Sequence, residues 1–116
     1  MIEISIRKFL ESKMSVPVLM EENPNSRVSQ FVILERTGGA QVNYISTAII
    51  TIQSYAGTMQ EAAELNEEVK RWMLDGLDGL ITLDEVSSVS LNSDYNFTDT
   101  TSKRYRYQAV YEVTHY

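Results

Sequence analysis

The stretch that decides the fold is ISTAIITIQSYAGTMQEAAELNEEVKRWML, residues 45–74. Its first part is rich in β-branched side chains, which favour a strand, and it places Ile50 and Ile52 on one face with Ile49 on the other. Its second part repeats apolar residues at steps of three and four, the spacing of an amphipathic helix. We therefore expect a central strand over residues 45–55 and a long helix directly after it.

The start of this helix is marked by Thr58, which follows Gly57 and stands three residues before Glu61. At this spacing a hydroxyl and a carboxylate can accept hydrogen bonds from each other's free backbone N–H groups in the first turn. We expect roughly 17 to 19 helical residues that end at Gly76 or Gly79.

Upstream, apolar residues at steps of three and four over residues 2–14 predict an amphipathic N-terminal helix that Ser15 closes. Residues 16–20 alternate and contain Pro17, which cannot donate to a sheet, so they predict an edge strand. Residues 21–29 hold an Asn-Pro-Asn-Ser turn cluster. Residues 31–34 predict a buried strand that ends in a flexible loop at Thr37, Gly38 and Gly39.

Downstream, residues 86–91 and 105–113 alternate as the two strands of a hairpin, separated by a long loop over residues 92–103. Tyr105, Tyr107 and Tyr111 share a face with Ala109 and Val113, which favours a buried sheet face over a surface that stacks nucleic-acid bases. The predicted fold class is α+β. It is a small, mostly antiparallel sheet packed against one long helix, with an N-terminal helix, in a single domain of residues 1–116.

Composition excludes several kinds of chemistry. The 116 residues contain no Cys and one His, which rules out disulfide scaffolds, Cys-based zinc sites and Cys nucleophiles. His115 stands beside the C-terminal residue without a partner motif, so we read it as structural. We expect no catalysis, cofactor or metal. An Asp94 to Asp99 calcium loop lacks the necessary pattern of ligands and reads as a solvated loop.

The formal net charge is -6, from 10 Lys and Arg against 16 Asp and Glu. This balance argues against sequence-specific nucleic-acid binding. Residues 37–60 carry no charge but contain too many polar side chains to span a membrane, and we expect neither a membrane partner nor a signal peptide. Residues 75–99 hold six acids and no Lys or Arg, so they form either a solvated surface or a functional acidic face.

Several strings occur here in a familiar order. They are VPV at residues 16–18 after an amphipathic helix, FVILERTGG at residues 31–39, the strand of residues 49–55, and a helix opened by Thr58 with EAA at residues 61–63. In this order and spacing the chain resembles the tail terminator, or tail completion, proteins of long-tailed bacteriophages and prophages.

The resemblance implies a structural protein that forms a hexameric ring on the last ring of the tail tube, stops tube growth and joins the tail to the head-tail connector protein. Its partners would be copies of itself, the tail tube protein and the connector, in a virion tail assembled in the bacterial cytoplasm. We expect a ring or tube contact at Arg36, Thr37, Gly38 and Gly39. We also expect acids such as Asp84 and Glu85 to repel DNA from the lumen. The alternatives are another head-tail connector or neck component, and a small α+β binding module outside phages.

Overall fold

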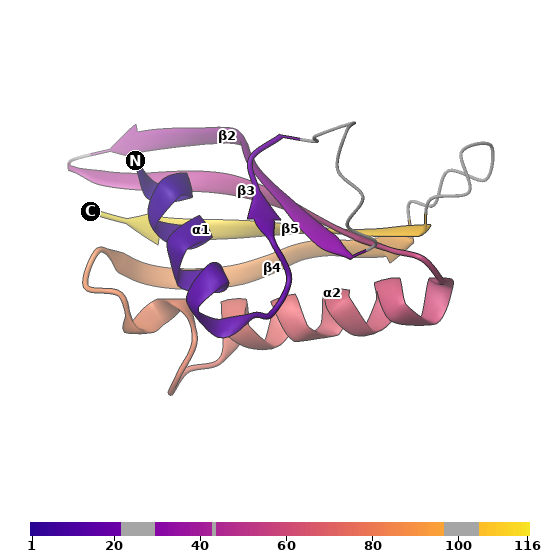
Figure 1. Ribbon diagram of the computed structural model, residues 1–116. Helices are drawn as coiled ribbons and strands as arrows, with labels where there is room; N and C mark the ends of the chain where they lie inside the picture. Colours follow the sequence, from indigo (N-terminus) through magenta and orange to yellow (C-terminus); the bar gives the residue numbers. More distant parts are fainter. Residues whose placement is uncertain (22–29, 43, 97–104) are drawn as a thin grey trace.

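The computed structural model describes residues 1–21, 30–42, 44–96 and 105–116. The elements, in chain order, are α1 (Ile2–Lys13), β1 (Val18–Leu19), β2 (Phe31–Val42), β3 (Ile45–Ala56), α2 (Met59–Leu74), the 3-10 turn η1 (Leu80–Thr82), β4 (Val86–Asn96) and β5 (Tyr105–His115) (Figure 1). The strands form one sheet in the order β1-β2-β3-β5-β4. Among the described strands only β1 and β2 pair in parallel, so the predicted α+β class with a mostly antiparallel sheet is confirmed.

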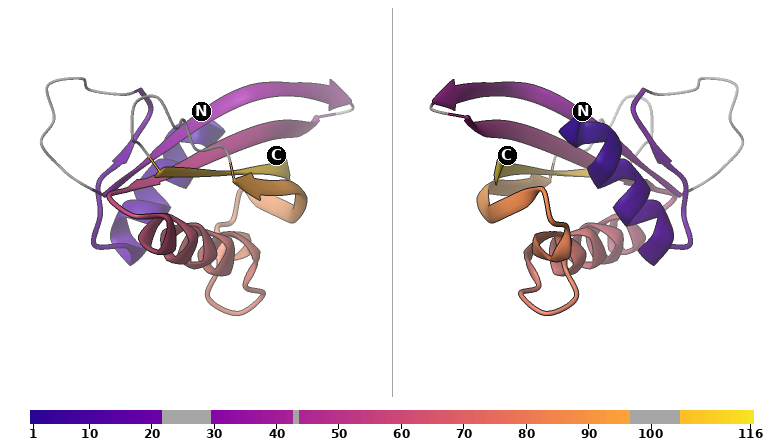
Figure 2. Two further views of the ribbon diagram at one scale, coloured as in Figure 1. Left: turned by 90° about the vertical axis from the view of Figure 1, so that its right-hand side faces the viewer. Right: turned by 90° about the vertical axis from the view of Figure 1, so that its left-hand side faces the viewer.

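Both helices lie on the same side of the sheet, and the hydrophobic core fills the space between them and the strands (Figure 2). Ile50 and Ile52 of β3 are fully buried, as their shared face predicts. They meet Leu65 and Val69 of α2 and Leu10 of α1 in a single cluster. Alternation along β3 and helical periodicity along α2 therefore act together to make one apolar layer.

The N-terminus of α2 follows half of the predicted capping arrangement. The Thr58 hydroxyl accepts a hydrogen bond from the backbone N–H of Glu61 at 3.2 Å. The Glu61 carboxylate does not reach back and instead accepts from the Gln30 amide at 2.9 Å. The helix has 16 residues and ends at Leu74, before either of the expected glycine stops. Its last turn is followed by Asp75, whose extended backbone ends the helical path.

The predicted loop at residues 37–39 is wrong, because these residues lie inside β2. This strand pairs with β3 over its whole length, and the register shifts by one residue between Arg36 and Gly38. The extra residue at this bulge is Thr37. A bulge lets the hairpin continue past an irregular position, so the two glycines join the ladder opposite Ile49 and Ala48 instead of ending it.

The predicted long loop of residues 92–103 is also wrong in part. Residues 92–96 belong to β4, which pairs with β5 up to Asn96, whereas residues 97–103 lie outside the described residues. The predicted edge strand at residues 16–20 is present as the two-residue strand β1 at the margin of the sheet. Most of the predicted turn at residues 21–29 lies outside the described part of the chain.

Candidate interaction surfaces

The residues predicted for a ring contact, Arg36 to Gly39, lie in the part of β2 that β1 does not cover. The Arg36 guanidinium folds back and donates to the carbonyl of Gly38 at 3.2 Å. The Thr37 hydroxyl lies 3.0 Å from that of Thr51 on β3, so the bulged residue is tied to its neighbouring strand. Three of the four residues are exposed and Gly38 is half-buried, which leaves an accessible but ordered surface.

Gly39 is required by its geometry. Its φ is +155°, and a Cβ added there would lie 2.5 Å from the backbone oxygen of Thr47. Only glycine adopts this conformation readily and lets the two strands approach this closely. The two glycines therefore shape the hairpin of β2 and β3, in place of the loop freedom expected from the sequence.

The other two predicted residues, Asp84 and Glu85, lie in an exposed turn immediately before β4. The Glu85 carbonyl accepts from the backbone N–H of Tyr116, which fixes the turn against the end of the chain. The strand register aligns Val86 with His115, and His115 with Ser46 next to the β2–β3 turn. The acidic pair thus belongs to the end of the sheet that holds this turn.

Arg36 lies further along the strands, away from the end of the sheet that holds the acidic pair. It pairs with Ile50, which pairs with Tyr111, which pairs with Leu91 in the middle of β4. The structure therefore does not bring the two groups of predicted residues together. They are two separate candidate surfaces, one on the outer side of β2 and one at the end of the sheet.

The sequence predicts Asp94 in a solvated loop, but the structure places it in a polar cluster between β4 and α2. The Asp94 carboxylate lies 2.6 Å from the Lys70 ammonium and accepts from the Asn66 amide at 2.7 Å. Lys70 also pairs with Glu67 at 2.6 Å. Hydrogen bonds to Asp94, and secondly to Glu67, raise the pKa of Lys70 above its usual value of 10.5. The cluster ties the edge strand to α2.

Tyr111 is fully buried on the strand next to this cluster. Burial, with smaller contributions from the charges of Asp94 and Glu67, raises the pKa of its hydroxyl, which therefore stays protonated. The Tyr111 hydroxyl and the Asn66 side-chain oxygen are buried without a hydrogen-bond partner among the described residues. The prediction that the tyrosine stripe lies in the core is confirmed for Tyr111, whereas Tyr105 and Tyr107 are half-buried.

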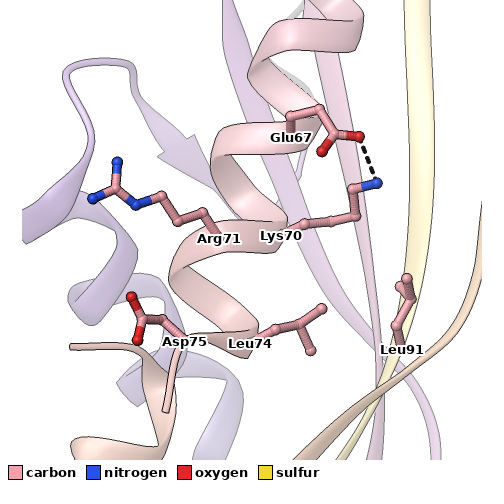
Figure 3. Close-up of a pocket in the computed structure, with 6 residues that line it drawn as sticks. All are labelled: Glu67, Lys70, Arg71, Leu74, Asp75 and Leu91. Carbon is pink, nitrogen blue, oxygen red and sulfur yellow. Dashed lines mark ion pairs between the residues drawn. The ribbon is translucent and has the colours of Figure 1, made fainter. Parts of the chain in front are cut away.

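An open groove of about 510 Å³ runs between α2 and β4 (Figure 3). Lys70 and Leu74 extend toward Leu91 of β4, whereas Arg71 and Asp75 point to the opposite side of the helix. Charged side chains make up most of the lining, which is unlike the enclosed apolar pockets that bind small ligands.

The turn between β2 and β3 exposes apolar side chains. Val42, Tyr44 and Ile45 are exposed, and Tyr44 has a positive φ of 69°. Ala40, Val42, Ile45 and Thr47 line a shallow hollow of about 300 Å³ beside the turn. The only sequence signal for this surface is the uncharged run of residues 37–60, which the sequence analysis assigned to a loop and a buried strand.

On the face of the sheet opposite the helices, side chains of three strands form a hydrogen-bonded row. The Tyr55 hydroxyl donates to Gln53 at 3.0 Å, Gln53 donates to Gln108 at 3.0 Å, and Gln108 donates to the Tyr95 hydroxyl at 2.5 Å. Arg106 donates to the Tyr55 hydroxyl at 2.9 Å. This row crosses β3, β5 and β4, so it fixes the relative positions of the strands.

Other sites considered from the sequence have these outcomes. His115 lies in β5, and its Nε2 is buried without a partner among the described residues. Asp94 of the rejected calcium loop is on β4, whereas Asp99 lies outside the described residues. Within the described ranges, no three His, Cys, Asp or Glu residues gather in a way that could hold a metal ion. No described helix is long and apolar enough to cross a membrane.

Comparison with known proteins adds no assignment, because no protein-family model and no curated protein matches the chain.

Proposed function

We propose that this chain is a structural protein of a long-tailed bacteriophage or prophage, a ring-forming tail terminator that caps the tail tube, stops its growth and joins the tail to the head connector. The proposal rests on the resemblance in the order of elements and in the strings of residues 16–18, 31–39 and 61–63. The observation that carries it is a sheet whose two margins, β4 on one side and most of β2 on the other, have no further strand beside them among the described residues. Such margins are suited to joining subunits.

The acidic turn has a place in this proposal. Asp84 and Glu85 are exposed and adjoin the end of the sheet that carries the apolar β2–β3 turn. If that end borders the lumen of the ring, the two carboxylates repel DNA phosphates and keep the passing genome from binding the wall.

The test of the tail role is electron microscopy of particles made with the gene deleted. Overlong, headless tails support a terminator, because tube growth has then lost its stop. Tails of normal length beside unattached heads would assign the protein to the connector side of the neck. Intact infectious particles would overturn both readings and leave a small α+β binding module, for which the open, mainly charged groove between α2 and β4 is a poor ligand site.

The lumen role has its own test. We expect the double variant Asp84→Asn with Glu85→Gln to assemble normal tails and to eject DNA more slowly. The matched control is Glu11→Gln, a carboxylate on α1 that faces solvent and pairs with Arg7. Unchanged ejection in the acidic-turn variant contradicts the lumen assignment without touching the terminator proposal.

A further inference from the structure

The face of the sheet opposite the helices has two halves of different character. The half near the start of β5 carries the hydrogen-bonded row that runs from Tyr55 to Tyr95, so its polar side chains have partners within the chain. No described helix covers the other half, which lies toward the β2–β3 turn (Figure 2). We call this half the turn-side face, and its members are Ala40, Val42, Ile45, Thr47 and Ile49.

The strand register places the members of the turn-side face on one side. Ala48 and Ile50 of β3 are fully buried toward the helices, so the three β3 members, which alternate with them, point the other way. The two β2 members pair with the outer two of these, and the four together line the hollow of about 300 Å³. Gly38 pairs with Ile49 and adds no side chain above it. The hollow is therefore open to an incoming group.

Two carboxylates border the turn-side face. Glu35 pairs with Thr51, and Glu112 pairs with Ile49, so both side chains point to the same side of the sheet as the hollow. Glu35 is exposed and Glu112 is half-buried. Neither forms an ion pair with another described residue. The border of the apolar hollow is therefore negatively charged.

No basic side chain of the sheet balances these carboxylates among the described residues. The basic residues of β2 to β5 are Arg36 and Arg106. Arg36 pairs with the buried Ile50, so it lies on the helix side of the sheet, and its guanidinium donates to a carbonyl of its own strand. Arg106 lies at the far end of β5, 5.6 Å from the ring centroid of Tyr55. The turn-side face thus combines an apolar hollow with negative charge alone.

This charge selects the kind of molecule that suits the face. Nucleic-acid phosphates would meet Glu35 and Glu112 with like charge, and so would the same face of a second copy. A basic protein surface meets them with opposite charge. Val42 and Ile45 are 67% and 45% exposed, so a partner that covers them removes apolar area from water.

We infer that the turn-side face binds a basic segment of a partner protein. The segment places an apolar side chain in the hollow and Lys or Arg side chains beside Glu35 and Glu112. The inference goes beyond the proposed tail role and uses neither Asp84 nor Glu85, the acids assigned to the lumen there.

The experiment is an NMR titration of the ¹⁵N-labelled full chain with end-blocked pentapeptides of sequence KFKFK, SFSFS and EFEFE. These probes share their apolar side chains and differ in charge. We expect KFKFK to bind several-fold more tightly than SFSFS, and EFEFE to bind most weakly. The amide signals that KFKFK shifts should be those of residues 40–42, 45–49 and 110–114, because these surround the hollow and Glu112.

Two variants separate the charge from the hollow. Glu35→Gln with Glu112→Gln should remove the preference for KFKFK over SFSFS. Ala40→Trp fills the hollow from an exposed position and should weaken binding of both peptides several-fold. The matched control is Glu64→Gln with Glu68→Gln, which removes the same net charge from the exposed side of α2 and should leave binding unchanged.

Equal affinity for KFKFK and EFEFE overturns the inference, as do shifts confined to another surface or the lack of any shift at millimolar peptide. Dilution of the chain without peptide tests the remaining occupant. If the same amide signals move with protein concentration, the face binds a second copy and the inference fails. These outcomes are independent of tail length in deletion particles, by which the tail role is judged.

Discussion

Asp94→Ala should destabilise the fold, although Asp94 sits in a Ser- and Asn-rich segment that looks like a surface loop. Its carboxylate accepts from the Asn66 amide at 2.7 Å and pairs with Lys70 at 2.6 Å. Asn66 is only 2% exposed, and its side-chain N–H group depends on Asp94 for an acceptor. Leaving a buried amide N–H group unsatisfied costs about 1–3 kcal/mol.

Loss of the ion pair between Asp94 and Lys70 costs less free energy than loss of the buried hydrogen bond. The side chain of Lys70 is 18% exposed and keeps its contact with Glu67 after the substitution, so the loss is about 0–1 kcal/mol. Asp94→Ala should therefore lower the free energy of unfolding by about 1–4 kcal/mol. Asp94→Asn keeps an oxygen for Asn66 and should cost about 1 kcal/mol or less. The difference in unfolding free energy between the two variants measures the contribution of the hydrogen bond from the Asn66 amide.

Urea denaturation of wild type and both variants measures these values, and Asp84→Ala in the exposed turn is the control, with an expected change within about 0.5 kcal/mol. If Ala and Asn at position 94 destabilise the fold equally, the Asn66 hydrogen bond does not carry the effect and the reasoning fails. The pH dependence offers a second check. The Lys70 pKa is raised in the folded state, so its contribution is present below pH 10.5 and is lost as pH rises through the folded value.

Three further predictions follow from single contacts. Thr58→Ala removes the helix cap and should cost about 1 kcal/mol in urea denaturation, whereas Thr58→Ser should retain most of it. Gly39→Ala forces a Cβ against a backbone oxygen of β3 and should cost more than about 1 kcal/mol, whereas Gly57→Ala meets no atom within 4 Å and should be neutral or stabilising. Asp75 accepts two backbone hydrogen bonds that lower its pKa below 3.8. Wild type should therefore lose stability relative to Asp75→Asn as pH falls through that lowered value, and pH-independent differences would contradict this.

The packing of β3 against α2 was predictable because both elements must bury their apolar side chains in the same layer. Ile50 and Ile52 must face one layer, and Leu65 and Val69 must face it from α2, so period two and period 3.6 leave few alternatives. The Thr58 cap is local to the chain and needs no tertiary information. These features follow from short-range spacing, which the sequence displays directly.

The candidate surfaces were harder to predict because their roles depend on residues far away in the chain. Gly38 and Gly39 resemble a flexible loop locally, yet a long β-branched partner strand holds them in a ladder. Lys70 and Asp94 meet only when the register of β4 on β5 and the packing of α2 are both set. The spacing of residues along the sequence predicts neither the strand register nor the helix packing.

The full length of β4 was not predicted because the strand lies at the margin of the sheet. An outermost strand has a partner on one side only, and along β4 just Val86 is buried and Val89 half-buried against the core. Apart from Asp94 and Tyr95, which make side-chain contacts, most of its other positions are free to be Ser and Asn, so the strand loses the alternation by which strands are recognised. Ser and Asn leave backbone groups accessible where Lys or Pro would block them. This mainly polar strand is thus placed in the sheet by its register with β5 and by the contacts of Asp94 with α2, and its own pattern of side chains displays neither.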